Sequence, residues 1–170
     1  MAETKVITAS YPFTSETALP GWELHQQDAG MVNRVVFWTL GGLMTLLSLP
    51  ALAFGPAALM PLAIGAVCLS VPALIERTMR QLIKKREAEG ATVEGKFSED
   101  SAAIHTGKSL LEIKWPAVLK TVLAKEGILI YQGKYNYHWF PRNAFASQED
   151  YEACVALIAR KVGSVKRKGV

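Results

Sequence analysis

The sequence has few cysteines, few histidines and none of the common catalytic motifs. Two cysteines, Cys68 and Cys154, are too few for a disulfide scaffold, and three scattered histidines give no spacing typical of a metal site. There is no Gly-x-Ser-x-Gly elbow, no His-Glu-x-x-His helix and no glycine-rich phosphate loop. These absences predict that the protein is not an enzyme and has no catalytic residues, no metal and no cofactor.

Charge is missing from one long stretch of the chain. Residues 35–75 contain no Asp, Glu, Lys, Arg or His, and 29 of these 41 residues are hydrophobic. About 20 apolar residues cross the hydrocarbon core of a bilayer, so the stretch is long enough for two spans. The turn dipeptide Gly55-Pro56 divides it into arms at 35–54 and 57–75, which predicts a two-helix transmembrane hairpin.

Proline leaves an alternative open for this stretch. Pro50, Pro61 and Pro72 interrupt the two arms and Pro56 lies in the turn, and a re-entrant hairpin that enters the bilayer and returns on the same side would also accommodate these four prolines. Small residues at helical spacing predict that the two arms pack against each other. The faces expected to meet are Gly41, Thr45 and Ser48 on the first arm and Ala66, Ser70 and Ala73 on the second.

Basic residues lie at the outer ends of the two arms. Arg34 precedes the first arm, and the turn between the arms carries no charge. The basic residues after the second arm are Arg77, Arg80, Lys84, Lys85 and Arg86. By the positive-inside rule, both termini are expected in the cytoplasm, with the hairpin in the inner membrane of a bacterium.

Two further segments flank the hairpin. Residues 1–34 form an N-terminal cytoplasmic segment in which 5–11 could be a strand, and the sequence leaves open whether that strand joins a sheet. Residues 76–90 are charged and helix-favouring, so we expect a basic juxtamembrane helix that stops at Gly90.

Residues 91–170 alternate between apolar and polar types, which predicts about six short strands joined by tight turns. The period then changes. Apolar residues from Tyr151 to Val162 recur on one face of an amphipathic helix, and Ser147 followed by Asp150 is typical of a helix start. The predicted fold class is an α+β membrane protein, in which the hairpin precedes a small antiparallel sheet with a C-terminal amphipathic helix.

Several segments in this order carry a resemblance to a known family. They are the hairpin, a turn at 97–100, a Trp-Pro-Ala-Val step at 115–118, and a stretch at 137–145 that contains Phe-Pro-Arg-Asn-Ala-Phe. The chain resembles the YcxB-like family of small bacterial membrane proteins, whose C-terminal domain is similar to pleckstrin-homology-like domains. The resemblance implies a membrane-tethered cytoplasmic domain with a sheet-plus-helix fold, and it implies no defined reaction.

Binding is the function class that remains. The net charge is +4, but no segment has Lys and Arg residues interleaved with exposed aromatic residues along one face. We therefore expect no nucleic-acid partner. Arg142 could grip a phosphate or carboxylate through two hydrogen bonds, and basic residues near a bilayer attract anionic lipid. The candidate residues for binding lipid or a partner are Arg77, Arg80, Lys84, Lys85, Arg86, Arg142, Lys166, Arg167 and Lys168.

These observations predict a cytoplasmic interaction or regulatory module that the hairpin tethers to the inner membrane, where it binds a protein partner. Two alternatives stay open. One is a reader of anionic lipid headgroups, and the other is an accessory subunit of a membrane complex or transporter. The sequence does not identify the partner, the ligand or the oligomeric state.

Overall fold

The computed structural model describes residues 6–51, 55, 59–107 and 109–168. The chain divides into two units, which are considered separately. An α+β unit contains Met1–Leu24 and Ile83–Val170, and a helical unit contains His25–Leu82. The first residues of the chain therefore belong to the same unit as its C-terminal half.

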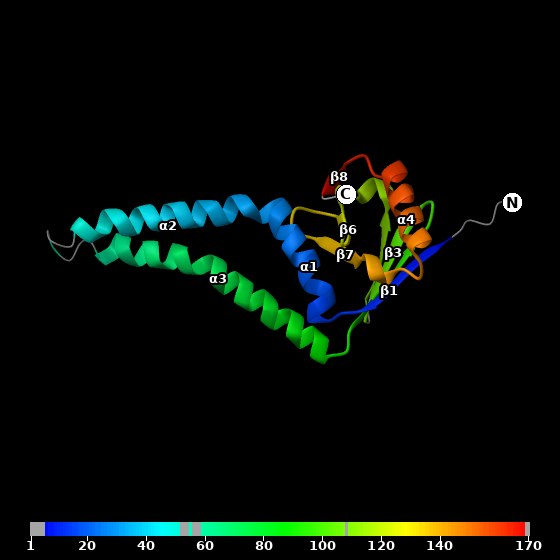
Figure 1. The fold of residues 1–170 in the computed structure, drawn as a ribbon, viewed down its shortest axis with the longest axis horizontal. Coiled ribbons are helices and arrows are strands. Elements are labelled where there is room, and N and C mark those ends of the chain that lie inside the picture. The colour runs from blue at the N-terminus through cyan, green and yellow to red at the C-terminus, as the bar shows by residue number, and fades with distance from the viewer. Residues whose placement is uncertain (1–5, 52–54, 56–58, 108, 169–170) are drawn as a thin grey trace. The chain divides into compact units, whose positions relative to one another are not determined.

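Helices and strands follow one another along the chain as Figure 1 shows. Their bounds are β1 (Ile7–Pro12), α1 (Ser15–His25), a π-helical turn (Gln26–Gly30), α2 (Met31–Ala51), α3 (Leu59–Ala88), β2 (Thr92–Phe97), β3 (Ser101–Thr106), β4 (Ser109–Lys114), a 3-10 turn (Trp115–Ala117), β5 (Lys120–Ala124), β6 (Gly127–Tyr131), β7 (Tyr137–Pro141), a second 3-10 turn (Arg142–Ala144), α4 (Gln148–Lys161) and β8 (Val165–Lys168).

The first sheet is antiparallel and has the strand order β1-β2-β3-β4. Strand β1 pairs with β2 along its whole length, from Ile7 opposite Phe97 to Pro12 opposite Thr92. Burial alternates along both strands, as the period-two pattern of β2 predicts. The candidate strand near the N-terminus thus joins the sheet, and α1, α2 and α3 lie in sequence between two paired strands.

The second sheet has the order β7-β6-β5-β8. Strands β5, β6 and β7 form an antiparallel meander, whereas β8 pairs with β5 in parallel. The α+β class and the C-terminal helix are confirmed, but the strands form two sheets where one was expected. The chain leaves the first sheet at the Trp115–Ala117 turn, where Pro116 cannot donate a backbone hydrogen bond to continue a strand.

Both faces of the second sheet are covered. The core between the sheets includes Phe97, Ile130 and Phe140, and α4 packs against it through Cys154 and Ile158. On the other face, Leu24 of α1 joins a separate apolar cluster with Val122, Ala124, Leu129, Tyr131 and Trp139. Every residue of β6 is therefore buried.

Helix α1 was not expected, because Pro20 and Gly21 read as irregular chain. The helix begins with reciprocal bonds between Thr14 and Thr17, in which each backbone N–H donates to the hydroxyl of the other residue. Pro20 lies inside the helix. Burial of Ala18, Trp22 and Leu24 offsets the hydrogen bond that this proline cannot make.

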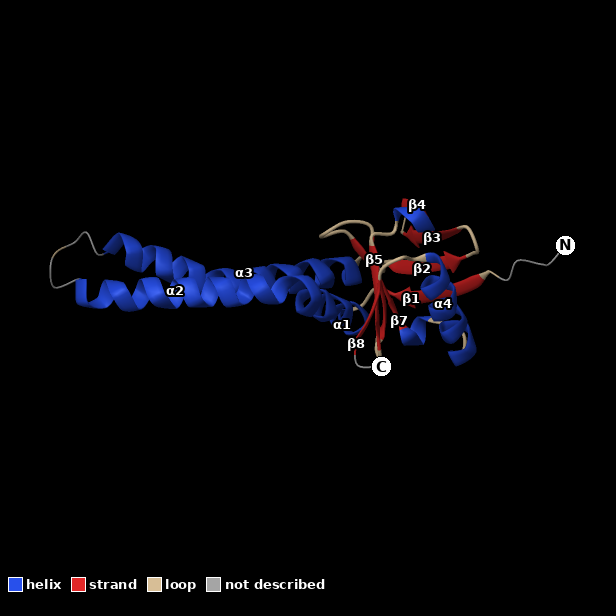
Figure 2. Ribbon diagram, turned by 90° about the horizontal axis from the view of Figure 1, so that it is seen from above, coloured by secondary structure: helices blue, strands red, loops and turns tan. Residues whose placement is uncertain are grey.

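In the helical unit, α2 and α3 run antiparallel and lie side by side in both ribbon views (Figures 1 and 2). Their backbones approach closely at two glycines: a Cβ atom on Gly41 would lie 3.0 Å from the carbonyl oxygen of Gly65. At one end, Arg34 and Glu76 form an ion pair of 3.0 Å between the helices.

The face predicted for α2 is confirmed, since Gly41 and Ser48 are buried and Thr45 is half-buried. The face predicted for α3 is wrong. Gly65 and Pro72 face α2, whereas Ala66, Ser70 and Ala73 are exposed. Gly65 lets the backbones come closer than alanine or serine would, so it sets which side of α3 packs.

One helix in the described part of the chain, Leu59–Ala88, is long and apolar enough to cross a membrane by length and composition. The apolar part of α2, Arg34–Pro50, is shorter. Helix α3 runs on beyond residue 76 to Ala88, and Gly90 then takes a left-handed φ of 66°. The centre of the expected turn, including Pro56, lies outside the described residues, while Gly55 has a φ of 134°.

Candidate functional site

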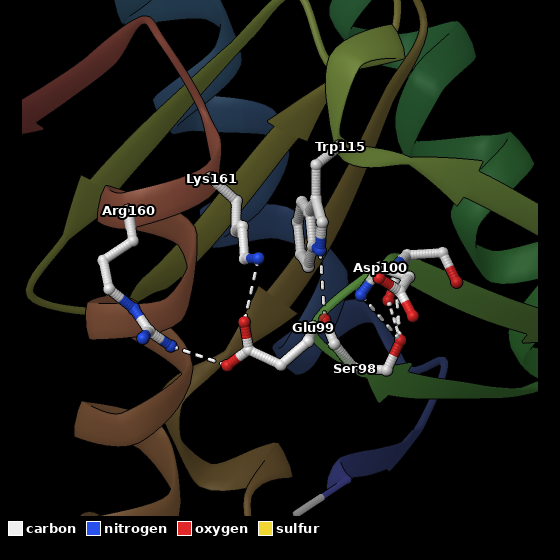
Figure 3. Close-up of polar contacts among 7 residues, drawn as sticks. Ser98, Glu99, Asp100, Trp115, Arg160 and Lys161 are labelled. Atoms are coloured by element: carbon white, nitrogen blue, oxygen red, sulfur yellow. Dashed lines mark hydrogen bonds and ion pairs between the residues drawn. The ribbon is translucent and has the colours of Figure 1, made fainter. Parts of the chain in front are cut away.

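Figure 3 shows the polar contacts that the turn at 97–100 makes with Trp115 and with the end of α4. Trp115 Nε1 donates to the carbonyl oxygen of Ser98 at 3.0 Å. The neighbouring Glu99 forms ion pairs with Arg160 at 2.8 Å and Lys161 at 2.9 Å, in the last turn of α4. These two cations hold the pKa of the Glu99 carboxyl below its usual value. The ion pairs connect the end of α4 to the turn between β2 and β3.

The aromatic residues of β7 face opposite sides of the second sheet. Phe140 is fully buried between the sheets, with its ring centroid 5.0 Å from that of Phe97. Trp139 faces α1, and its Nε1 donates to the carbonyl oxygen of Thr17 at 2.8 Å. Trp115 belongs to the core between the sheets and Trp139 to the other cluster. Packing therefore accounts for these aromatic residues, and they do not line a common groove.

A groove of about 390 Å³ lies between α4 and the C-terminal ends of β5 and β8. Three basic residues line it, Lys125, Arg142 and Arg167, together with one acidic residue, Glu152. The aliphatic part of the lining consists of Leu123, Ala124, Val155, Ala156 and Ala159. We call this set of residues, with Gln148 and Tyr151, the α4 groove. It combines positive charge with an apolar wall.

Arg142 is held in position within the α4 groove. Its Nε donates to Oε1 of Gln148 at 2.7 Å, and its guanidinium lies 5.4 Å from the centroid of the Tyr151 ring. The Tyr151 hydroxyl donates to the carbonyl oxygen of Ala124 at 3.1 Å, and burial raises the pKa of this phenol. Tyr151 therefore stays protonated at neutral pH and supports the flat face of the guanidinium.

Gln148 connects the basic and acidic sides of the groove. Its amide nitrogen donates to Oε1 of Glu152 at 2.6 Å, while its amide oxygen accepts from Arg142. Within the described residues, the terminal nitrogens of Arg142 have no hydrogen-bond partner. An arginine in this state can donate both terminal N–H groups to one carboxylate or phosphate.

The C-terminal basic residues that the sequence proposed for binding lipid or a partner belong to a strand. Lys166, Arg167 and Lys168 lie in β8, whose residues pair in parallel with Thr121 to Ala124 of β5. Side chains alternate along a strand, so Arg167 lines the α4 groove and its two neighbours lie on the opposite face. The three charges therefore do not act as one patch.

The basic residues that follow the second apolar arm do not line this groove in the described structure. Arg80 is bonded to Glu76 one turn earlier, and the guanidinium of Arg86 lies 5.9 Å from the centroid of the Phe13 ring. Arg77, Lys84 and Lys85 are exposed on α3. Of the nine candidates from the sequence, the structure thus brings Arg142 and Arg167 together at one site.

Sequence reasoning missed the other members of the groove. Lys125 lies in the turn before β6, and Gln148, Glu152, Ala156 and Ala159 lie along one side of α4. The signal was a second helical face, at spacings of three and four residues, beside the apolar stripe that was recognised. Small residues there mark a surface that the rest of the domain does not cover.

Comparison with known proteins gives one match. Residues 97–158 match the family model described as YcxB-like protein. No curated protein and no solved structure matches the chain. The match begins at the last residue of β2 and ends in α4, so it covers β3 to β7 and the groove residues from Leu123 to Ala156. It confirms the resemblance seen in the sequence for residues 97–158, which are similar to a YcxB-like domain.

Proposed function

We propose that this chain is an interaction module anchored in a membrane by a helical hairpin that interrupts its sheet. Helices α2 and α3 cross the membrane, and the α+β unit binds a protein partner at the cytoplasmic surface. The observation that carries the proposal is the pairing of β1 with β2 on either side of the hairpin in sequence.

The surface of the helical unit supports insertion into lipid. Large apolar side chains remain exposed along both helices, with Leu46 at 67%, Leu47 at 66% and Met60 at 73% of their full exposure. Only 11% of the apolar window of α3 is buried within the protein. Soluble proteins rarely leave an apolar surface of this extent in water, whereas a bilayer covers it at no cost.

The sheet topology supports an even number of crossings. Since β1 and β2 are hydrogen-bonded to each other, the chain must leave and re-enter the α+β unit on the same side of any membrane. If α3 crosses once, a second crossing is required, and α2 is the remaining described helix of the unit. Its 21 residues extend roughly 32 Å, about the thickness of the hydrocarbon core.

Continuity of the helices favours spanning over a re-entrant path. Helix α2 includes Pro50, and α3 runs through Pro72 without a break. Residues 52–54 and 56–58, where a re-entrant path would turn, lie outside the described residues. A helix satisfies its own backbone hydrogen bonds in lipid, which an irregular segment cannot do unless protein or water covers it.

Charge sets the orientation in this proposal. Arg34, Arg77 and Arg80 lie at the ends of the helices nearest in sequence to the two strands, so the positive-inside rule assigns the α+β unit to the cytoplasm. Within the α+β unit, the segment that leads into α1 is hydrogen-bonded to the end of α3 and to the segment that follows it. Phe13 N–H donates to the carbonyl oxygen of Ala91 at 2.8 Å, and Ser15 N–H donates to Glu87 at 3.1 Å.

Membrane extraction tests the anchoring. The full-length chain, expressed in a bacterium, is expected to stay with the membrane pellet in alkaline carbonate and in high salt, and to enter solution only with detergent. Peripheral attachment through basic residues would instead be released by salt, because salt screens such charges. Release by carbonate or salt would contradict the proposal.

A further inference from the structure

We propose that the α4 groove binds an acidic segment of a protein partner, with a carboxylate on Arg142 and an aliphatic side chain against the alanines of α4. This inference rests on the proposed function and specifies the chemistry of its partner. It is carried by the arrangement of charge, the fixed arginine and the apolar wall of the groove.

Charge in the groove selects a negative ligand. The lining carries three positive charges, on Lys125, Arg142 and Arg167. It carries one negative charge, on Glu152, whose carboxylate already accepts a hydrogen bond from Gln148. The groove therefore has a net formal charge of +2. Complementary charge favours an acidic partner and disfavours a basic one.

The guanidinium of Arg142 has a fixed orientation in the groove. Gln148 holds its Nε, and Tyr151 supports the plane of the guanidinium, so less side-chain freedom is lost when a ligand binds. With Nε occupied, the two terminal nitrogens form the part of the fork that can donate to both oxygens of one carboxylate.

The apolar wall favours a protein segment over a small free anion. Ala156 and Ala159 are exposed, and with the half-buried Val155 they form an aliphatic surface beside the charges. A small anion would leave this surface in contact with water. A segment with an aliphatic residue near its carboxylate would cover it and gain from that burial.

Peptide selection tests the proposal on the full-length chain in detergent. The probe is an array of short peptides that vary independently in Asp and Glu content and in aliphatic content. We expect the bound peptides to be enriched in both acidic and aliphatic residues, with binding that weakens as salt is raised. Binding without enrichment in acidic residues would overturn the proposal.

Variants place the binding in the groove. Arg142→Gln is expected to weaken the binding of a selected peptide about tenfold, and Arg142→Lys severalfold, because lysine keeps the charge without the fork. Lys96→Gln, which removes one exposed charge from β2 outside the groove, is the matched control and should bind like the wild type. Equal losses in Arg142→Gln and Lys96→Gln would overturn the proposal.

A second kind of variant leaves every charge in place. Ala156→Trp fills the groove and is expected to block peptide binding, whereas Ala88→Trp at the exposed end of α3 should not. Thermal unfolding of each variant shows whether it is folded. Unchanged binding in folded Ala156→Trp would place the partner elsewhere and overturn the proposal.

Anionic lipid is the competing ligand. Vesicles that contain phosphatidylglycerol are expected not to displace a bound peptide, and displacement that depends on Arg142 would overturn the proposal in favour of a lipid headgroup. Arg142→Gln should also remain in the membrane pellet during carbonate extraction. Loss of peptide binding and loss of anchoring are therefore separate results, and each contradicts a different claim.

Discussion

Gly21 shows how a single residue positions a whole helix of the α+β unit. A Cβ atom at this position would lie 2.3 Å from Cγ of Trp139, so the indole occupies the space of a side chain. The same indole donates to Thr17 one turn earlier in α1. In the sequence, Gly21 after Pro20 reads as a helix breaker. In the fold, it is the contact that lets α1 cover the second sheet.

Replacement of Gly21 tests this packing. Gly21→Ala is expected to lower the free energy of unfolding by about 1–3 kcal/mol, because the added methyl group forces Trp139 out of its position. Urea unfolding of the full-length chain in detergent, followed by tryptophan fluorescence, measures the change. Gly163→Ala is the control, since a Cβ atom there meets nothing within 4 Å. Equal midpoints for the two variants would contradict the account of α1.

His138 gives the α+β unit a dependence on pH. Burial lowers the pKa of His138 from its usual 6.5, and the ring contacts Oε1 of Gln132 at 3.3 Å. The folded state therefore binds a proton less readily than the unfolded state. The stabilisation is complete above the unfolded pKa of 6.5 and is lost as pH falls below it towards the folded pKa.

A histidine variant checks this dependence. His138→Gln removes the titrating group, so the thermal midpoint should fall less steeply than in the wild type as the pH is lowered below 6.5. Ser15 lowers the pKa of Glu87, and Lys161 with Arg160 lowers the pKa of Glu99. The stabilisation from these two carboxylates is therefore lost only below pH 4.5, outside the range in which His138 acts. Identical slopes in the two proteins would show that His138 does not contribute.

At the scale of elements, the sequence predicted those strands and helices whose conformation depends on residues nearby in the chain. The alternation in β2 and the capped amphipathic helix α4 were both evident in the sequence. Strand β8 was not, because four residues, three of them basic, have no strand-forming pattern and owe their conformation to β5, more than 40 residues earlier. Burial of all of β6 likewise depends on α1, which is distant in sequence.

The packing of α2 on α3 has a direct chemical test. A Cβ atom on Gly41 would lie 3.1 Å from Cβ of Cys68, close to the roughly 3.5–4.5 Å that a disulfide requires. Gly41→Cys requires the helices to separate slightly, because its Cβ atom would lie 3.0 Å from the carbonyl oxygen of Gly65. It is then expected to cross-link to the native Cys68 under mild oxidation, which mass spectrometry of the digested protein detects.

Gly42→Cys is the matched control for this cross-link. It lies one residue further along α2, and a Cβ atom there meets nothing within 4 Å. We expect little cross-linking from it in membranes at low protein density, where contacts between chains are rare. If Gly42→Cys cross-linked as fast as Gly41→Cys, the packing face described for α2 would be wrong.

At the scale of the whole molecule, the candidate site was predictable only in part. The sequence pointed to Arg142 because an arginine can form two hydrogen bonds to one anion, and to Arg167 as a member of a basic cluster. Nothing local indicated that these two residues meet, because they approach only when β8 pairs with β5 beside α4. The strand alternation that brings Arg167 to the groove also separates it from Lys166 and Lys168.

The sheet topology shows that the hairpin is inserted within the α+β unit and does not precede it. In the sequence, the hairpin precedes the domain as a separate anchor. In the structure, β1 precedes it and β2 follows it in one sheet, so the domain is complete only after the hairpin has been made.

Site-directed labelling of cysteine tests the two crossings most directly. In a chain with Cys68→Ser and Cys154→Ala, single cysteines are introduced as Val6→Cys before β1, Ala57→Cys between α2 and α3, and Tyr135→Cys in the exposed turn before β7. Intact bacterial cells are treated with a maleimide that does not cross the inner membrane. The account predicts labelling at position 57 alone, with positions 6 and 135 labelled only after lysis. Labelling of position 6 or 135 in intact cells, or protection of position 57 until lysis, would contradict it.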